Sequence, residues 1–301
     1  MDKDKFVIYF TGGTMRGVFG VGVAKAFENN NLYPKISVVY GASAGVMTGA
    51  YFLAKQTELG ASIYWEDLRK KFISRKDFFI GVWQRFQDEF IKTVPQDELH
   101  DALNIEYLMK VVKDEKSLDT QKIISQEIPL NVKLFDLDTH DIKYIDARRP
   151  DILEILRAGV NAFPYVHEIS MIDNKKYIDA AIIDIVGFDY LRQKHPTEKI
   201  IIVMNGQIDR KFRYRAKNIL EGKFMQWMFD DPALYNLYAT AEDKLAKDIE
   251  KIKCDSNSLL ITQDKDVLVR SRTTDAKLLL EMYNLGIKAG NRALQSSFMN
   301  S

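Results

Sequence analysis

Short, mostly apolar runs alternate with longer amphipathic runs along the first 55 residues of the chain. The apolar runs Phe6–Phe10 and Ile36–Tyr40 are rich in β-branched and aromatic residues, which predicts strands buried on both faces of a parallel sheet. The runs Val18–Asn29 and Ala44–Lys55 have helical patterns. This order of strand, loop, helix, strand, turn and helix predicts a βαβ unit with a right-handed crossover.

The remainder of the chain predicts further strands and many helices. The middle, from about Trp65 to Gln126, and the last third of the chain are mostly helical in pattern. Further expected elements are strands at Val132–Asp136, Lys143–Ile145, Lys199–Met204 and Ser258–Thr262, a helix at Asp151–Ala158, and a hairpin from His167 to Ala181 with its turn at Asp173–Lys176. No repeat or low-complexity linker divides the sequence. We therefore expect one domain over residues 1–301, with a core at about 5–210 and a mainly helical extension at about 211–301.

A glycine-rich loop follows the first predicted strand. The segment Gly12-Gly13-Thr14-Met15-Arg16-Gly17 opens a helix, where backbone N–H groups can face a bound anion. It fails as a phosphate-binding P-loop because Val18-Phe19 follow Gly17, and as a dinucleotide fingerprint because Thr14 stands where the second glycine belongs. An oxyanion hole fits better, because this loop and the next turn follow neighbouring strands and face each other. A tight turn without a ligand is the plain alternative.

The turn after the second predicted strand has the form G-x-S-x-G. In Gly41-Ala42-Ser43-Ala44-Gly45 the serine would be held in a sharp turn with its hydroxyl clear of the sheet. The small flanking residues let strand and helix approach closely, and the helix N-terminus offers positive potential to an oxyanion. A plain strand-to-helix turn has similar residues. The predicted strand and helix on either side favour a nucleophile.

These motifs, taken in order, resemble those of the patatin-like phospholipase family. The family pattern is a G-G-G-x-[RK]-G loop, a G-x-S-x-G elbow on the next strand, and a distant Asp-Gly-Gly or Asp-Gly-Ala. The segment Arg157–Pro164 is similar to the family's Ala-Ser-x-Ala-x-Pro segment, and Tyr177-Ile178-Asp179-Ala180-Ala181 stands where the family has its catalytic Asp. The resemblance covers most of residues 6–210 and is less diagnostic from about Leu259 onward.

The resemblance implies a three-layer α/β/α patatin-like fold with a mainly parallel central sheet. It implies hydrolysis of carboxylic ester bonds of lipids, either phospholipids or glycerides, by a Ser-Asp dyad and without a metal or organic cofactor. Ser43 would attack the ester and Asp179 would take its proton. The implied oxyanion donors are the N–H groups of Gly12, Gly13, Thr14 and Ala44, and the implied loop-supporting residues are Arg16, Gly17, Gly41 and Gly45.

A Ser-Asp-His triad is the competing design. Ser43, Asp179 and His195 have the chain order of α/β-hydrolases, but the nucleophile of those enzymes follows several earlier strands and Ser43 follows the second. His195 lies in a polar stretch that we expect to be an exposed loop. No metal-ligand spacing connects the remaining histidines, which are His100, His140 and His167.

Two residues depart from the family pattern. Thr14 replaces the third glycine of the loop, and Ala180 replaces the glycine after the catalytic Asp. A β-branched residue is a poor substitute for glycine at positive φ and loses nothing at negative φ. Because the dyad and the rest of the loop are intact, we expect Thr14 at negative φ and hydrolysis retained. The alternative is a patatin-fold protein with weak or lost activity that acts as a lipid-binding or scaffold module.

Charge and composition bear on partners and location. The 43 Lys and Arg nearly balance the 42 Asp and Glu, which argues against a dedicated nucleic-acid binder. A single cysteine, Cys254, cannot form an intramolecular disulfide, and no stretch approaches the roughly 20 apolar residues of a membrane-spanning helix. We therefore expect a cytoplasmic protein whose partner is a lipid or small ester, with peripheral membrane contact left open. The sequence does not indicate the oligomeric state.

Two segments have both a membrane interpretation and a plain one. The apolar run Phe78–Trp83 fits a lid that dips into lipid or a core helix. The basic run Arg210–Arg215 would attract anionic headgroups or form a solvated helix face.

Overall fold

A computed structural model gives the fold of the chain. It describes residues 5–73, 102–163, 165–166, 168–206, 213–263 and 269–300, without the side chains of 213–215 and 300. The apolar run Phe78–Trp83, His100 and His167 lie outside the described residues, and so do the side chains of Arg210–Arg215.

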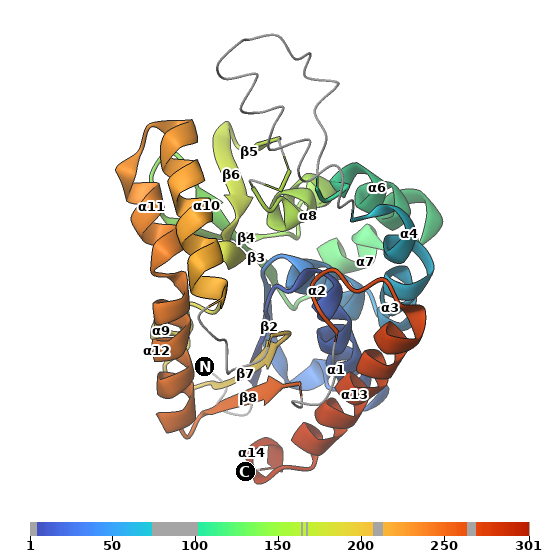
Figure 1. Ribbon diagram of the computed structural model, residues 1–301. Coiled ribbons are helices and arrows are strands. Elements are labelled where there is room, and N and C mark those ends of the chain that lie inside the picture. The colour runs from blue at the N-terminus through green and yellow to red at the C-terminus, as the bar shows by residue number, and fades with distance from the viewer. Residues whose placement is uncertain are drawn as a thin grey trace.

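A mixed sheet forms the middle layer (Figure 1). Its strand order is β5-β6-β3-β2-β1-β7-β8, and β4 pairs with the other edge of β3. The parallel run consists of β3 (Leu130–Asp136), β2 (Ile36–Gly41), β1 (Phe6–Phe10), β7 (Lys199–Met204) and β8 (Ser258–Thr262). The antiparallel strands are β4 (Ile142–Asp146), β5 (Ser170–Ile172) and β6 (Lys175–Asp179). The predicted mainly parallel sheet is confirmed.

Both faces of the central strands are buried, as their continuous apolar sequences predict. Phe6, Ile8 and Phe10 of β1 join one hydrophobic core, and Val7 and Tyr9 join a second core on the opposite face. This division follows from the alternation of side chains along a strand. The sheet is therefore the middle of three layers.

Helices cover the two faces unequally (Figure 1). The larger core packs against α1 (Gly17–Asn29), α2 (Ala44–Leu53), α8 (Ile152–Val160) and α13 (Ala276–Leu294). The second core packs against α9 (Phe188–Lys194) and α12 (Ala241–Cys254). A third, smaller core joins β3 and β6 to α10 (Arg213–Phe229) and α11 (Pro232–Ala239). The predicted three-layer α/β/α class is confirmed.

Shorter helices and turns complete the described chain. The helices are α3 (Thr57–Ile63), α4 (Arg69–Lys71), α6 (Ile105–Lys110), α7 (Thr120–Ser125) and α14 (Ser297–Asn300). π-Helical turns span Tyr64–Leu68 and Val111–Glu115, and 3₁₀ turns span Thr14–Arg16, Tyr33–Lys35 and Ala180–Ile182. Several starts are fixed by side-chain caps; Asp275, for example, accepts hydrogen bonds from the N–H groups of Lys277 and Leu278 before α13.

Two local expectations were wrong. The hairpin turn is shorter than predicted, because Asp173 and Asn174 both take positive φ and close a two-residue turn, so β6 starts at Lys175. His195 ends α9 and is 8% exposed, whereas the sequence predicted an exposed loop. Polar neighbours misled that prediction, because Arg192 covers the chain there by donating to the carbonyl oxygens of His195 and Glu198.

The C-terminal residues take part in the layers. Strand β8 extends the sheet beside β7, and α13 lies along α1. The two helices meet at glycines: a Cβ on Gly22 would lie 2.2 Å from the carbonyl oxygen of Tyr283, and one on Gly286 would lie 2.2 Å from that of Phe19. The division of the chain into one domain stays a prediction. Among the described residues, no helix has the length and apolar character needed to span a membrane.

Candidate active site

Strand β3 brings the two predicted dyad residues together. Along one edge, β3 pairs first with β2, where Gly41 lies opposite Val132, and then with β6, where Asp179 lies opposite Leu134. Because β2 runs parallel to β3 and β6 antiparallel, the carboxyl ends of β2 and β6 point at each other. Val132 and Leu134 are two residues apart, or about 7 Å along the strand. Ser43, two residues beyond β2, therefore lies next to Asp179.

The end of α8 holds both residues by their backbones. The Ser43 N–H donates to the carbonyl oxygen of Gly159 at 2.9 Å, and the Asp179 N–H donates to that of Asn161 at 2.9 Å. Gly159 has no room for a side chain, since a Cβ there would lie 2.6 Å from Val132 Cγ1. The segment that resembles the family's Ala-Ser-x-Ala-x-Pro thus joins Ser43 to Asp179.

Ser43 has the backbone of a sharp elbow. Its φ of 53° and ψ of −130° lie in a region that non-glycine residues seldom adopt. The predicted supporting glycines are required by close approach: a Cβ on Gly45 would lie 2.0 Å from the carbonyl oxygen of Phe10, and one on Gly41 would lie 2.7 Å from that of Gly45. The crossing of strand and helix therefore tolerates no side chain at either position.

Asp179 is a buried carboxyl with a perturbed pKa. Its side chain is 2% exposed, and this burial raises its pKa to about 6. The N–H of Ala181 donates to its Oδ1 at 2.8 Å, and this bond, the Ser43 hydroxyl and the charge of Lys133 each oppose the rise. Oδ2 is buried and accepts no hydrogen bond of regular geometry among the described residues. One carboxylate oxygen is thus available for a proton from Ser43.

The glycine loop lies directly against Ser43. A Cβ on Gly12 would lie 2.8 Å from Ser43 Cβ and 2.9 Å from Ala181 Cβ. No hydrogen bond within the described residues uses the N–H of Gly12, Gly13, Thr14 or Ala44. The four N–H groups predicted to bind an oxyanion therefore have no partner in that part of the chain.

The expectation of negative φ at Thr14 was wrong. Thr14 has φ 52°, directly after Gly13 in an extended conformation with φ 162°. The loop has little room to turn, since Gly12 contacts Ser43 on one side and a Cβ on Gly13 would lie 2.9 Å from Asn205 Cβ on the other. The chain reverses within one residue to start the 3₁₀ turn, and Thr14 is that residue. Ala180, in contrast, is not among the described residues with positive φ.

The remaining predicted supporting residues close the loop. Arg16 Nε donates to the carbonyl oxygen of Gly13 at 3.4 Å, and Gly17 lies where a Cβ would be 2.3 Å from the Tyr64 hydroxyl oxygen and 2.7 Å from Ala44 Cβ. The 3₁₀ turn and the start of α1 are therefore packed against the start of α2.

The sequence match decides the family. A family model described as patatin-like phospholipase matches residues 8–192, more than half of the chain, including Ser43 and Asp179. This chain belongs to the patatin-like phospholipase family. A comparison with curated proteins gave no significant match.

Two solved structures show similarity to this chain at low identity. VipD from Legionella pneumophila is 12% identical, with a TM-score of 0.48, and the match covers 97% of this chain and 67% of that chain. The structure of full-length SpcU in complex with full-length ExoU, from the type III secretion system of Pseudomonas aeruginosa, gives 11% identity and a TM-score of 0.34. That match covers 82% of this chain and about half (52%) of the other.

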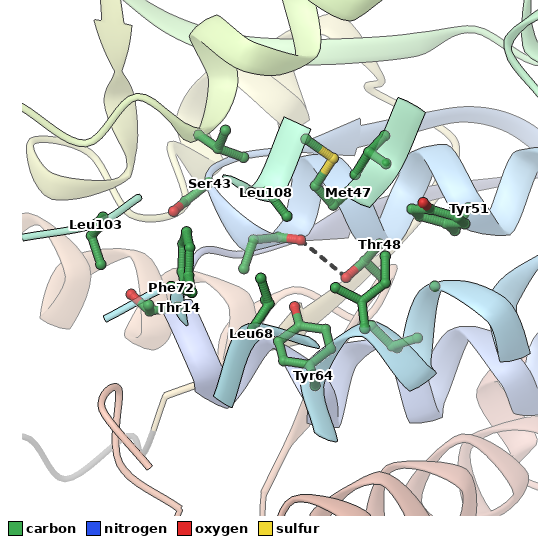
Figure 2. Close-up of a pocket in the computed structure, with 16 residues that line it drawn as sticks. Thr14, Ser43, Met47, Thr48, Tyr51, Tyr64, Leu68, Phe72, Leu103 and Leu108 are labelled. Atoms are coloured by element: carbon green, nitrogen blue, oxygen red, sulfur yellow. Dashed lines mark hydrogen bonds between the residues drawn. The ribbon is translucent and has the colours of Figure 1, made fainter. Parts of the chain in front are cut away.

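An apolar pocket of this chain begins at Ser43. In the view of Figure 2, Ser43 and Thr14 lie at one end and Tyr51 at the other. The cavity has a volume of about 50 Å³. Its apolar lining comes mainly from α2, α3, the Tyr64–Leu68 turn and the segment after residue 102, and includes Met47, Ile63, Leu68, Phe72, Leu103, Leu108 and Val112. Ser43 therefore faces a narrow space suited to hydrocarbon.

His195 is engaged away from the dyad. Its Nε2 lies 2.9 Å from the Tyr40 hydroxyl oxygen and its Nδ1 lies 2.7 Å from Glu198 Oε2. Both ring nitrogens thus have partners other than Ser43 and Asp179, which argues against a triad. No group of three His, Cys, Asp or Glu residues is arranged to hold a metal ion in the described ranges.

Sequence reasoning missed two polar residues near the site. Lys133 is fully buried on β3, where its Nζ donates to the carbonyl oxygens of Asp184 at 2.6 Å and Val186 at 3.1 Å, and its charge acts on Asp179. Asn205, directly after β7, is also fully buried and contacts the glycine loop. The signal was present in both cases: a lysine inside an apolar strand, and an asparagine at the carboxyl end of a parallel strand.

Proposed function

We propose that this chain is a serine acyl hydrolase that cleaves carboxylic ester bonds of lipids through a Ser43–Asp179 dyad. The observation that carries the proposal is the meeting of β2 and β6 on one edge of β3, which joins a serine in a sharp elbow to a buried carboxyl of raised pKa. A general base with a pKa near the working pH is efficient at proton transfer. Family membership supports lipid hydrolysis in general.

The reaction follows the geometry of the site. Asp179 takes the proton of the Ser43 hydroxyl as the oxygen attacks the ester carbon. The negative oxygen of the tetrahedral intermediate accepts hydrogen bonds from the N–H groups of Gly12, Gly13, Thr14 and Ala44, which have no partner among the described residues. Asp179 then passes the proton to the departing alcohol. The bond between the ester carbon and the alcohol oxygen breaks, and the acyl group stays on Ser43. Water, activated by the same carboxylate, releases the acid and restores the enzyme.

The apolar pocket supports a lipid acyl group as the part of the substrate that is bound. Its volume of about 50 Å³ is well below the roughly 150 Å³ of a cavity that takes up benzene. A long acyl chain therefore requires the apolar side chains that line the pocket to move. The proposal covers both phospholipids and glycerides, because the pocket residues concern the acyl group and not the headgroup. We keep a cytoplasmic location with peripheral membrane contact as a prediction.

A second candidate is a lipid-binding or scaffold module with weak or lost activity. The observation that favours it is the positive φ of Thr14, a β-branched residue at a glycine position of the family's loop. The strain is of the order of 1–3 kcal/mol, which a folded loop can sustain. We favour the hydrolase, because the elbow, the base and the free N–H groups are all compatible with catalysis.

The dyad is tested by turnover on a short-chain p-nitrophenyl ester and on phospholipid and glyceride emulsions. Ser43→Ala and Asp179→Asn are each expected to abolish hydrolysis, and the double variant should be little worse because the two residues act as one unit. A fluorophosphonate should label the wild-type protein. It should label Asp179→Asn slowly or not at all, and it should not label Ser43→Ala. Ser62→Ala, which loses a half-buried hydroxyl bonded to the Leu59 carbonyl, is the matched control and should keep full activity.

Two outcomes would contradict the proposal. Additive losses in the double variant would count against a dyad. A folded wild-type protein that binds lipid emulsions but is neither labelled nor active would support the binding module instead.

A further inference from the structure

Both polar atoms of the Asn205 side chain make hydrogen bonds to residues that flank the glycine loop. Its Nδ2 donates to the carbonyl oxygen of Thr11 at 2.6 Å, and its Oδ1 accepts from the N–H of Gly20 at 2.8 Å. Thr11 directly precedes the loop, and Gly20 lies in the first turns of α1 behind it. One fully buried amide therefore joins the two ends of the segment that contains Gly12, Gly13 and Thr14.

The backbone of Asn205 is fixed as well. Its N–H donates to Thr11 Oγ1 at 2.9 Å, and its carbonyl oxygen accepts from Gln263 Nε2 at 2.8 Å. Gln263 follows β8, so the asparagine is held between β1 and the far parallel strands. The side chain consequently acts on the loop from a rigid position at the carboxyl edge of the sheet.

The Thr11 contact sets the direction of the next N–H group. In a planar trans peptide the C=O and the N–H point in opposite directions. Because the Thr11 carbonyl points at Asn205, the Gly12 N–H of the same peptide points away from Asn205. A Cβ on Gly12 would lie 2.8 Å from Ser43 Cβ, and a Cβ on Gly13 would lie 2.9 Å from Asn205 Cβ. The loop thus lies between the asparagine and the nucleophile.

We infer that Asn205 is a positioning residue, which aims the Gly12 N–H at the oxyanion formed on Ser43. This inference rests on the proposed function. The role needs a donor and an acceptor in one planar group, because Thr11 offers a carbonyl and Gly20 an N–H. An aspartate of the same shape would turn an acceptor toward the Thr11 carbonyl and repel it, and a serine is too short to bridge both partners.

The test compares Asn205→Asp and Asn205→Ser with wild type on a short-chain p-nitrophenyl ester, at matched folded fraction by circular dichroism. Outright removal of one oxyanion donor lowers kcat by about 10²–10³-fold. Misplacing the donor should have a smaller effect. We therefore expect kcat to fall at least about tenfold with KM changed less than threefold, and the rate of fluorophosphonate labelling of Ser43 to fall in parallel. If Asn205→Asp does not fold, the serine variant decides.

Thr57→Val provides the control, because it removes the hydrogen bond that the buried Thr57 hydroxyl donates to Glu28 Oε2 and leaves the contacts of Asn205 with Thr11 and Gly20. It should lower the melting temperature with kcat kept within about threefold. A fall in kcat of less than tenfold in the Asn205 variants, or a change mainly in KM, would overturn the inference. The proposed function would still stand if the wild-type protein is active. A wild-type protein without Ser43-dependent hydrolysis would overturn both.

Discussion

Ser43 and Thr14 both have positive φ, and they face the same pocket. A sparsely populated backbone conformation of this kind costs a non-glycine residue about 1–3 kcal/mol. At Ser43 the cost has an evident return, since the elbow exposes the hydroxyl. At Thr14 the loop already has the conformation that a glycine would take, so the N–H group is expected to be in place.

Thr14→Gly tests that reading. Strain relief should outweigh the extra unfolded-state entropy of glycine, which is worth about 0.5–1 kcal/mol, so we expect stability to rise by up to about 1 kcal/mol. Turnover of a short-chain p-nitrophenyl ester should stay within about threefold of wild type. Thr14→Ala, which keeps a Cβ, should gain less stability. A hundredfold increase in turnover, about the value of one oxyanion donor, would instead show that the native loop is catalytically impaired.

The pKa of Asp179 predicts a pH dependence with two readouts. The folded protein holds this proton up to about pH 6, whereas the unfolded chain releases it near 3.8. The native state thus binds more protons in this window, so the residue's contribution to stability falls as pH rises through it, by about 3 kcal/mol in all. Below pH 6 the base is protonated, and kcat/KM should fall about tenfold per pH unit.

Asp179→Asn, an uncharged isostere, should remove this pH-dependent term. Chemical denaturation should find it more stable than wild type at pH 8 by up to about 3 kcal/mol, with the difference gone near pH 3.5. A constant difference across this range would mean that the native pKa is not raised.

At the scale of elements, α2 directly follows the elbow and lines part of the apolar pocket. Met47 is one helical turn beyond Ser43 and lines the pocket. Met47→Ala should enlarge the cavity and raise kcat/KM for a twelve-carbon p-nitrophenyl ester relative to a four-carbon one by about tenfold or more, roughly the worth of one to two buried methylenes. It should cost about 2–5 kcal/mol of stability. Met47→Leu conserves volume and is the control. An unchanged ratio would place the acyl chain elsewhere.

The strands and helices of the βαβ unit were predictable because their signals are local. β1 and β2 are apolar throughout, and a glycine turn follows each. Local sequence does not show which strand ends lie next to each other. The proximity of Ser43 and Asp179 was therefore predicted only from the family resemblance, and the pairing of β3 with β2 and β6 explains it. Asn205 and the φ of Thr14 could not be predicted, because both depend on how tightly the loop is packed between two other segments.

At the scale of the whole molecule, the contact between α1 and α13 joins the C-terminal residues to the helix that follows the glycine loop. Gly286→Ala would put a Cβ 2.2 Å from the Phe19 carbonyl oxygen, and a backbone atom cannot move aside as a side chain can. We expect a loss of about 1–3 kcal/mol, measured by thermal or chemical denaturation. Asn284→Ala, on the exposed side of α13, should stay within about 0.5 kcal/mol of wild type. Equal effects would mean that the helices do not meet at these glycines.

Because β3 pairs with both β2 and β6, the distance between the two members of the proposed dyad does not depend on the number of residues between them. Ser43 and Asp179 are 136 positions apart in the sequence, yet Val132 and Leu134 set their separation. Segments between α2 and β3 can gain or lose residues without moving either member of the proposed dyad, provided that β3 keeps its register and the end of α8 keeps its backbone contacts with Ser43 and Asp179. If Ser43 and Asp179 form the proposed dyad, the segment between α2 and β3, part of which lines the pocket, is free to diverge in evolution while the dyad keeps its geometry.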